Sequence, residues 1–469
     1  MSGKPLAEGL PARQRPWALF AVMLPIIMSV LDTQIANVAL PTLSRQLEIT
    51  PATSIWIVNS YQLALVAALL PMSSLGDVIG HRRVFNWGIV VFTLASLACA
   101  LSTTLPVLAA SRIVQGLGAG AVMGVDLVLI RYIFPPERLG RGVALLGLSI
   151  ACAAASGPSV ASAVLELAPW TWLFAVNVPI GLIAVALGWR FLPVIPGSGQ
   201  KFDLPSAITS ALTFGLLITG LDGIAHHENP LIVAGEFAVA LVSGILMVRR
   251  QNALETPVFA VDLFRRPVFA LSILTGLCAY TTQGLAYISL PFYFQELLGR
   301  SQAETGLLIT PWPLAIVIVA QISGRLSDRL PAGLMGGFGL ATVATGLALL
   351  AFLPDDPSTA NILWRMAICG AGFSLFQTPN ARSILSSVPK ERSGNATGIN
   401  ATSRTLGQAT GAALTALIFG FFAEAGGGLG LAPVTAILLG VCVAASGSLV
   451  SFLRLIPKNP ATDRQKLPG

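Results

Sequence analysis

The amino-acid sequence predicts an all-α membrane protein with 14 transmembrane helices, arranged as two six-helix bundles with a two-helix insertion between them. Composition is the first indication: 54% of the 469 residues are hydrophobic, 10% are charged, and the mean hydropathy is +0.77. Soluble domains carry about a quarter charged residues. The charges also form short clusters between apolar runs of roughly twenty residues, the length needed to cross the hydrocarbon core.

Fourteen apolar runs are predicted to cross the membrane as helices. Their expected bounds are 17–40, 54–75, 84–104, 105–130, 142–165, 172–192, 204–224, 230–248, 268–290, 305–323, 333–353, 362–385, 396–422 and 429–453. The first run is too long for a signal peptide and no small-residue cleavage site follows it, so we expect no cleavable leader.

The positions of Lys and Arg support this count and set the orientation. An even number of spans places both termini on one side, and 23 of the 28 Lys and Arg residues then fall on that side. Arg45 and Arg300 fall on the other side, and three arginines lie within helices. Because cytoplasmic loops carry an excess of Lys and Arg, we expect both termini in the cytoplasm of a bacterial-type inner membrane.

The two halves of the chain repeat each other. Asp77 in SSLGDVIGHRR follows the second span, and Asp328 in GRLSDRL follows the tenth. Duplicated helical halves around a midplane site are how many secondary transporters are built. We therefore expect a cytoplasmic N-terminus over 1–16, a six-helix bundle over 17–193, a linker with two extra spans over 194–250, a second six-helix bundle over 251–454, and a cytoplasmic tail over 455–469.

The sequence contains no signature of an enzyme. HExxH, the P-loop GxxxxGK[ST], and a nucleophile with a matched base are all missing, and the missing P-loop also argues against ATP as the energy source. The five cysteines stand singly within apolar runs, so we interpret them as packing residues and expect no metal and no cofactor.

Asp32, in the stretch SVLDTQIANVALP, is an acid within the first predicted span. A carboxylate at membrane depth costs several kcal/mol unless it is compensated, and such residues often serve proton relays. From the rise of about 1.5 Å per helical residue, Asp32, Arg112 on the fourth span and Tyr61 on the second reach one layer of the membrane. We interpret Asp32 and Arg112 as a proton-coupling pair for which a cationic cargo competes; the alternative is a static clamp between two helices.

A second buried acid, Asp126, lies nearer the cytoplasmic end of the fourth span. It either carries a second proton, or attracts a cationic substrate, or pairs with Arg131.

Candidate cavity residues follow from helical spacing. On the ninth span Tyr280, Gln283 and Tyr287 share one face, which either lines a cavity or packs against neighbouring helices. Trp312 lies near mid-membrane between two prolines, which bend a helix and often mark a cavity wall; the alternative is a bulky packing residue at a bend. Phe376 and Gln377 on the twelfth span are weaker candidates for the same wall.

Several stretches, in order along the chain, resemble motifs of the major facilitator superfamily, and within it of the fourteen-helix drug:proton antiporter family. LDTQIANVALP resembles the first-helix signature of that family, SLGDVIGHRR resembles the loop motif between helices two and three, and RIVQGLGAG resembles the fourth-helix motif. ASGPSVAS resembles the fifth-helix antiporter motif, and WTWLFAVNVPIG and SLPFYFQELLG resemble the sixth and ninth helices.

The resemblance implies roles for further residues. Gln115 belongs to the fourth-helix motif and is placed with the substrate-binding residues, and the bend at Gly157 and Pro158 would limit proton leak. The remaining candidates are expected to control conformational change, as a cytoplasmic latch between the bundles or as its counterparts in the second half: Asp77, Gly80, Arg82, Arg83, Asp328 and Arg404.

The sequence therefore predicts a proton-driven exporter of amphiphilic, cationic drugs or toxic compounds that works by alternating access. The alternatives are a proton-coupled transporter of a specific polar metabolite, since a fold does not fix a function, and a membrane sensor that does not transport. We expect small-molecule substrates, protons and the lipid bilayer as partners, no nucleic acid, and a monomer.

Overall fold

The computed structural model describes residues 9–135, 138–197, 202–225, 229–253, 260–327, 329–354, 356–389, 392–424 and 430–455. Within these ranges every regular element is a helix, and 13 of the helices are long and apolar enough to cross a membrane. The predicted all-α membrane fold is confirmed. The protein is a multi-pass membrane protein.

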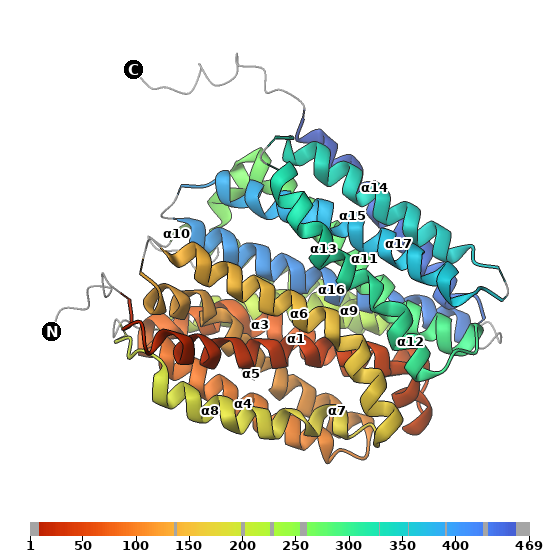
Figure 1. The fold of residues 1–469 in the computed structure, drawn as a ribbon, viewed down its shortest axis with the longest axis horizontal. Helices are drawn as coiled ribbons and strands as arrows, with labels where there is room; N and C mark the ends of the chain where they lie inside the picture. The colour runs from red at the N-terminus through yellow and green to blue at the C-terminus, as the bar shows by residue number, and fades with distance from the viewer. Residues whose placement is uncertain are drawn as a thin grey trace.

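The first half of the chain supplies the helices at the bottom of Figure 1, in red to yellow. Their bounds are α1 (Arg15–Gln46), α2 (Pro51–Ser54), α3 (Trp56–Ile79), α4 (His81–Ala100), α5 (Leu105–Ile133), α6 (Leu139–Leu167), α7 (Trp172–Ala175) and α8 (Asn177–Phe191). The extra pair consists of α9 (Leu204–Ala225) and α10 (Pro230–Ala253). The second half supplies η2 (Val261–Arg265), α11 (Pro267–Phe292), η3 (Tyr293–Leu297), α12 (Gln302–Ile309), α13 (Pro311–Leu326), α14 (Ala332–Ala351), α15 (Thr359–Ser386), α16 (Ser393–Glu424) and α17 (Ala432–Leu453).

Each predicted span corresponds to a helix or to two helical pieces in line. The break in the tenth span lies at Thr310, between α12 and α13, because Pro311 has no N–H to donate and starts a new helix. Similar breaks separate α2 from α3 and α7 from α8, and the ninth span ends in the π-helical turn η3. The twelfth span is α15, which is 28 residues long and carries Arg365, Gln377 and Asn380 within its sequence.

The chain crosses the bundle an even number of times, so α1 begins and α17 ends at the same end of the molecule. We call this end the termini face and the other end the opposite face. The loop from α1 to α2 and the connection from η3 to α12 therefore lie at the opposite face. These names make no assumption about which face is cytoplasmic.

Close helix packing in the first half depends on glycines of α5. A Cβ at Gly120 would lie 2.6 Å from the Cβ of Ala68, and one at Gly124 would lie 2.6 Å from the carbonyl oxygen of Leu69. Both neighbours belong to α3, so the backbones of α3 and α5 approach to a distance that only glycine allows. The contact fixes the depth of Arg112 on α5 relative to Tyr61 on α3.

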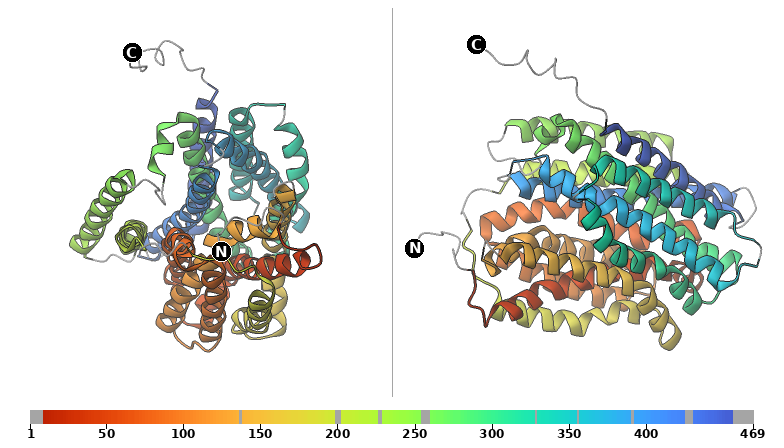
Figure 2. Two further views of the ribbon diagram at one scale, coloured as in Figure 1. Left: turned by 90° about the vertical axis from the view of Figure 1, so that its left-hand side faces the viewer. Right: turned by 45° about the horizontal axis from the view of Figure 1, so that its top comes forward.

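The extra helices lie at one side of the molecule, as the left view of Figure 2 shows. Helix α9 packs against α3 from the first half and against α16 from the second half, whereas α10 packs mainly on α9. An ion pair between Arg250 and Asp203, 2.7 Å long, joins the two extra helices at the termini face. The pair α9 and α10 thus covers one seam between the two bundles.

Candidate functional site

The Asp32 carboxylate is buried in a polar network within the first bundle. Its side chain is 1% exposed. Arg112 Nη1 forms an ion pair with Oδ2, while Gln115 Nε2 donates to Oδ1 at 2.9 Å and Asn177 Nδ2 donates to Oδ1 at 3.1 Å. Three donors from α5 and α8 therefore hold one carboxylate on α1. This arrangement satisfies a buried charge that would otherwise be costly.

Arg112 is fully buried, and its Nε and Nη1 atoms donate hydrogen bonds. Besides Asp32, its Nε donates to the carbonyl oxygen of Ile57 at 2.9 Å and its Nη1 donates to Gln115 Oε1 at 2.7 Å. The guanidinium carbon lies 4.2 Å from the centre of the Tyr61 ring, a cation–π contact. Tyr61 therefore reaches Arg112, and its hydroxyl donates to the carbonyl oxygen of Ser29 at 3.3 Å. The three residues expected in one layer of the membrane thus lie together, with Arg112 between the carboxylate of Asp32 and the ring of Tyr61.

Two members of the network were not singled out from the sequence. Asn177 begins α8 and donates to Asp32, and Ser96 on α4 accepts a hydrogen bond from Gln115 Nε2 at 2.9 Å. Each is one small polar residue in an apolar run, and such residues commonly bond to their own helix. For Asn177, the available signal was its position in WTWLFAVNVPIG, the stretch that resembles the sixth helix of the family.

A cavity of about 490 Å³ lies between the two bundles. A cavity of this size suits a drug-sized molecule. Its wall includes aromatic rings, five glutamine side chains and one charged residue. The lining residues that bear on the argument are Tyr61, Tyr280, Tyr287, Phe373, Gln34, Gln62, Gln283, Gln377, Gln408 and Arg404.

Some predicted binding residues lie behind this wall. Trp312 is fully buried, and its ring packs edge-on against Tyr287 with centroids 5.3 Å apart. Phe376 is also fully buried and contacts the ring of Tyr280 at 6.3 Å. Gln115 belongs to the Asp32 network. The predicted residues Tyr280, Gln283 and Tyr287 of α11 and Gln377 of α15 line the cavity. Trp312 and Phe376 instead pack behind the tyrosine rings.

Arg404 of α16 is the one charged side chain among the described residues that line the cavity. Asp126, on α5, is close enough for the charge of Arg404 to act on its carboxylate, but it is not among those lining residues. A cation held 6 Å from Arg404 would be repelled by about 2.8 kcal/mol at an effective dielectric constant of about 20. One cation–π contact returns only about 0.5–2 kcal/mol. The repulsion from Arg404 at that distance exceeds the attraction of a single cation–π contact.

The bundles are joined at the opposite face. Arg45, after the last buried turns of α1, forms an ion pair of 2.8 Å with Glu296. A second connection joins α6 to the second half. Ser162 of α6 donates to the carbonyl oxygen of Gln302 at 2.9 Å, and the hydroxyls of Ser159 and Thr310 are 2.8 Å apart. These contacts join the antiporter-motif helix α6 to the second half.

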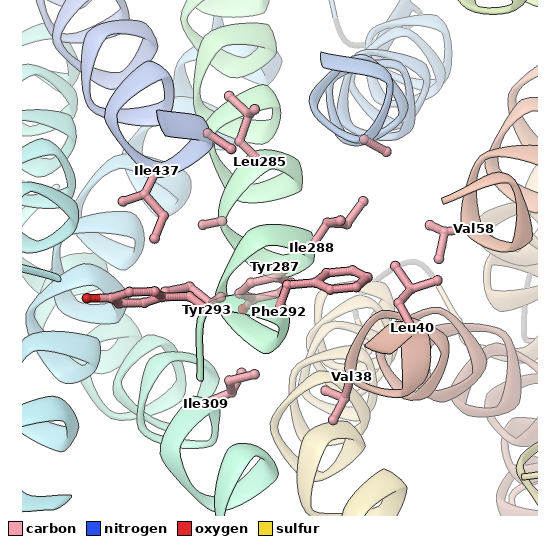
Figure 3. Packing of buried hydrophobic residues seen from close by; sticks show 14 of the residues in the cluster. Val38, Leu40, Val58, Leu285, Tyr287, Ile288, Phe292, Tyr293, Ile309 and Ile437 are labelled. Atoms are coloured by element: carbon pink, nitrogen blue, oxygen red, sulfur yellow. The ribbon is translucent and has the colours of Figure 1, made fainter. Parts of the chain in front are cut away.

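Apolar side chains complete this closure. Figure 3 shows Val38 and Leu40 of α1 in one cluster with Ile288 of α11 and Ile309 of α12. Below them, α6 lies directly on α1, since a Cβ at Gly157 would lie 2.5 Å from the Cβ of Gln34. Pro158, next in sequence, lies against α12, since a Cβ at Gly306 would overlap the carbonyl oxygen of Pro158. The cavity is therefore closed toward the opposite face.

The loop-motif residues have partners within the first half of the chain. Asp77 Oδ1 lies 3.2 Å from His81 Nε2, and Arg82 donates to the carbonyl oxygen of Trp189. Arg83 is exposed. Asp328, the counterpart of Asp77 in the repeat, lies outside the described residues. A latch between the bundles in this region stays a prediction.

Gly80→Ala is expected to destabilise the protein strongly. Gly80 joins α3 to α4 with φ +104°, and a Cβ there would lie 2.6 Å from the carbonyl oxygen of Ile195. The backbone conformation alone costs an L-residue of order 1–3 kcal/mol. We expect a clear drop in the Tm of the purified protein. Gly215→Ala on α9, where a Cβ meets nothing within 4 Å, is the matched control and should leave the Tm unchanged or slightly raised.

Comparisons with known proteins agree on one family. Residues 22–412 match the family model described as Major Facilitator Superfamily. The uncharacterized transporter YebQ of Escherichia coli K12 is 49% identical over 443 residues, which cover 94% of this chain and 97% of that protein. The riboflavin transporter RibZ of Clostridioides difficile is 31% identical over 88% of this chain and 89% of its own length. The multidrug efflux pump LfrA of Mycolicibacterium smegmatis is 30% identical, with 88% and 84% covered.

Solved structures give the same fold. A POT family transporter in complex with 5-aminolevulinic acid superimposes with a TM-score of 0.70 at 14% identity, covering 93% of this chain and 95% of that one. A bacterial homologue of the human lysosomal transporter Spinster, in an inward-facing and unoccupied conformation, has a TM-score of 0.68 at 13% identity, with 95% and 97% covered. Among the described residues, no group of His, Cys, Asp or Glu side chains could hold a metal ion.

Proposed function

Since the chain belongs to the Major Facilitator Superfamily and is one of its transporters, we propose that it exports amphiphilic compounds from the cytoplasm in exchange for protons. It is not an enzyme, and its relatives are transporters. In this proposal Asp32 carries the proton, the cavity between the bundles holds the cargo, and the two bundles alternate in opening to either side of an inner membrane.

The observation that carries the proposal is the environment of Asp32. The carboxylate is shielded from the cavity, because Tyr61 lines the cavity and packs on Arg112. It is shielded from the opposite face by the apolar cluster of α1, α11 and α12. A group that exchanged protons with both sides in one conformation would leak the gradient, so coupling needs such isolation. Movement of Tyr61 and Arg112 would then expose Asp32 on one side at a time.

The direction of transport rests on the orientation of the chain. The excess of Lys and Arg on the termini face supports a cytoplasmic location for that face. The cavity would then be closed toward the outside, ready to accept cargo from the cytoplasm. Each proton that enters supplies about 2.3 kcal/mol per 100 mV and about 1.4 kcal/mol per pH unit.

The relatives support two classes of cargo. LfrA is named a multidrug efflux pump, which favours a broad range of amphiphilic compounds. RibZ is named a riboflavin transporter, and it favours the second candidate, a proton-coupled transporter of one planar metabolite. The cationic cargo expected from the sequence has no support from the cavity wall, whose described lining residues include no acid.

Inside-out vesicles with an acidic lumen test the proposal. Cargo added to the medium should enter the lumen and drive protons out, so the lumen becomes more alkaline, as reported by a pH-sensitive dye. Vesicles without the protein should show no response. Cargo uptake that persists unchanged when the proton gradient is collapsed would contradict proton exchange.

A further inference from the structure

We infer that the cavity selects planar aromatic molecules that are neutral or negatively charged, and that Arg404 binds their electron-rich edge. The inference deepens the proposed function, since it takes the cavity to be the cargo site. It replaces the cationic cargo expected from the sequence.

Arg404 is available to a ligand. It lines the cavity, and no carboxylate of a described residue lies within the 4.0 Å of an ion pair from its guanidinium. Arg112, the buried arginine of the first half, instead uses its guanidinium on Asp32, Gln115 and a carbonyl oxygen. A planar guanidinium with free N–H groups on a cavity wall is a site for carboxylate, phosphate or carbonyl oxygen.

Neither buried acid offers a matching site for a cation. Asp32 is 1% exposed and already accepts hydrogen bonds from Arg112, Gln115 and Asn177. Asp126 is not among the described residues that line the cavity, its Oδ1 accepts a hydrogen bond from the N–H of Leu127, and it feels the positive charge of Arg404. Among the described residues that line the cavity, a cation would therefore meet a guanidinium and no carboxylate.

The remaining wall suits a flat ring with polar atoms on its edge. Tyr280 and Phe373 present rings 5.7 Å apart, inclined at 67°. Gln408 Nε2 donates to Gln283 Oε1 at 2.9 Å, so two amide groups lie side by side on the cavity wall. Amides both donate and accept hydrogen bonds, so they can pair with the ring nitrogens and carbonyl groups of a heteroaromatic molecule. A simple hydrocarbon offers them no such partner.

The counterpart of Asp32 in the second half supports the same division of roles. At the offset of 251 that relates Asp77 to Asp328, Asp32 corresponds to Gln283. The first bundle thus keeps a carboxylate, sealed by an arginine of its own. The second bundle has an amide at that position, and its arginine nearest to the place of Arg112, Arg365 on α15, donates to the carbonyl oxygen of Leu349. A further arginine, Arg404 on α16, lines the cavity. One half is built to hold a proton, and the other presents neutral and positive groups.

Three planar aromatic probes of similar size and different charge test the inference. Fluorescein is an anion, riboflavin is neutral and ethidium is a cation, and each can be titrated against purified protein in nanodiscs without any proton gradient. The wild type should bind fluorescein and riboflavin about tenfold or more tighter than ethidium. Arg404→Gln should weaken fluorescein by about tenfold, change riboflavin far less, and improve ethidium. Arg404→Lys should retain part of the affinity for fluorescein.

Arg249→Gln is the matched control, because Arg249 is exposed on α10, away from the cavity. It should leave all three affinities at wild-type values. Tighter binding of ethidium than of fluorescein, an unchanged fluorescein affinity in Arg404→Gln, or no binding of any probe would overturn the inference. Because the assay uses no gradient, its failure leaves proton coupling to be decided by the vesicle assay, and a failure of proton coupling leaves these affinities unaffected.

Discussion

Asp32→Asn is expected to reduce cargo-induced proton movement to background while the protein still binds its cargo. Asparagine keeps the size of the side chain and the hydrogen bond from Asn177 or Gln115, but it cannot carry a proton across the cycle. The cavity itself is unchanged, because Asp32 is buried behind Tyr61. Proton release in vesicles and binding of riboflavin in nanodiscs measure the two properties separately.

The single variant leaves Arg112 without its counter-charge, and breaking a buried ion pair costs about 3–5 kcal/mol. The double variant Asp32→Asn/Arg112→Gln removes both charges together and is expected to recover stability without recovering proton movement. Asp203→Asn, at the ion pair between α9 and α10, is a matched acid outside the network and should retain proton coupling. Normal cargo-induced proton movement in a folded Asp32→Asn protein would assign coupling to another group.

The comparison of these two readouts also separates coupling from a static clamp. If Asp32 and Arg112 only fixed α1 to α5, the double variant would restore transport together with stability. If Asp32 carries the proton, stability returns and coupling does not. The distinction needs both measurements on the same preparation.

The sequence predicts the parts of the site that depend on helix geometry. Asp32 and Arg112 were placed in one layer from the rise per residue alone, and the structure brings them into an ion pair. The shared face of Tyr280, Gln283 and Tyr287 lines the cavity, as one of the two interpretations held. These relations need only the depth and periodicity of single helices.

Relations between helices are harder to derive. Trp312 and Phe376 lie on suitable faces, but other rings stand between them and the cavity, and spacing along one helix says nothing about what the next helix places in front. Asn177 stands in a stretch that resembles a family motif, but its role cannot be derived from spacing because its partner, Asp32, lies on a different helix. The charge of the cavity wall is also set by several helices together: the sequence shows two buried acids, but only the structure shows that Arg112 pairs with one of them and that Arg404 lines the cavity.

Gly306→Leu is expected to prevent closure of the opposite face and so to abolish transport in a protein that still folds. A Cβ at Gly306 of α12 would overlap Ser162 Oγ and the carbonyl oxygen of Pro158, and would lie 2.8 Å from Ser162 Cβ. These atoms belong to α6, in the other bundle, so a leucine there forces the bundles apart without disturbing the core of either one. Overpacking of this kind costs about 1–3 kcal/mol or more, and about 3 kcal/mol shifts an equilibrium between two conformations by roughly 150-fold.

The shift can be measured as a distance. Spin labels at Gln46 and Ala303, in a variant whose five cysteines are replaced, would report the separation of α1 from α12 at the opposite face. Gly306→Leu should move the distance distribution to longer values, whereas Gly324→Leu on α13, where a Cβ meets nothing within 4 Å, should keep it unchanged and retain transport. A Gly306→Leu protein with the wild-type distances and wild-type transport would show that α6 and α12 need not approach each other in the cycle. Gly157 and Pro158 lie on α6, so that outcome would also remove the structural reason for giving these two residues a role in closing the opposite face.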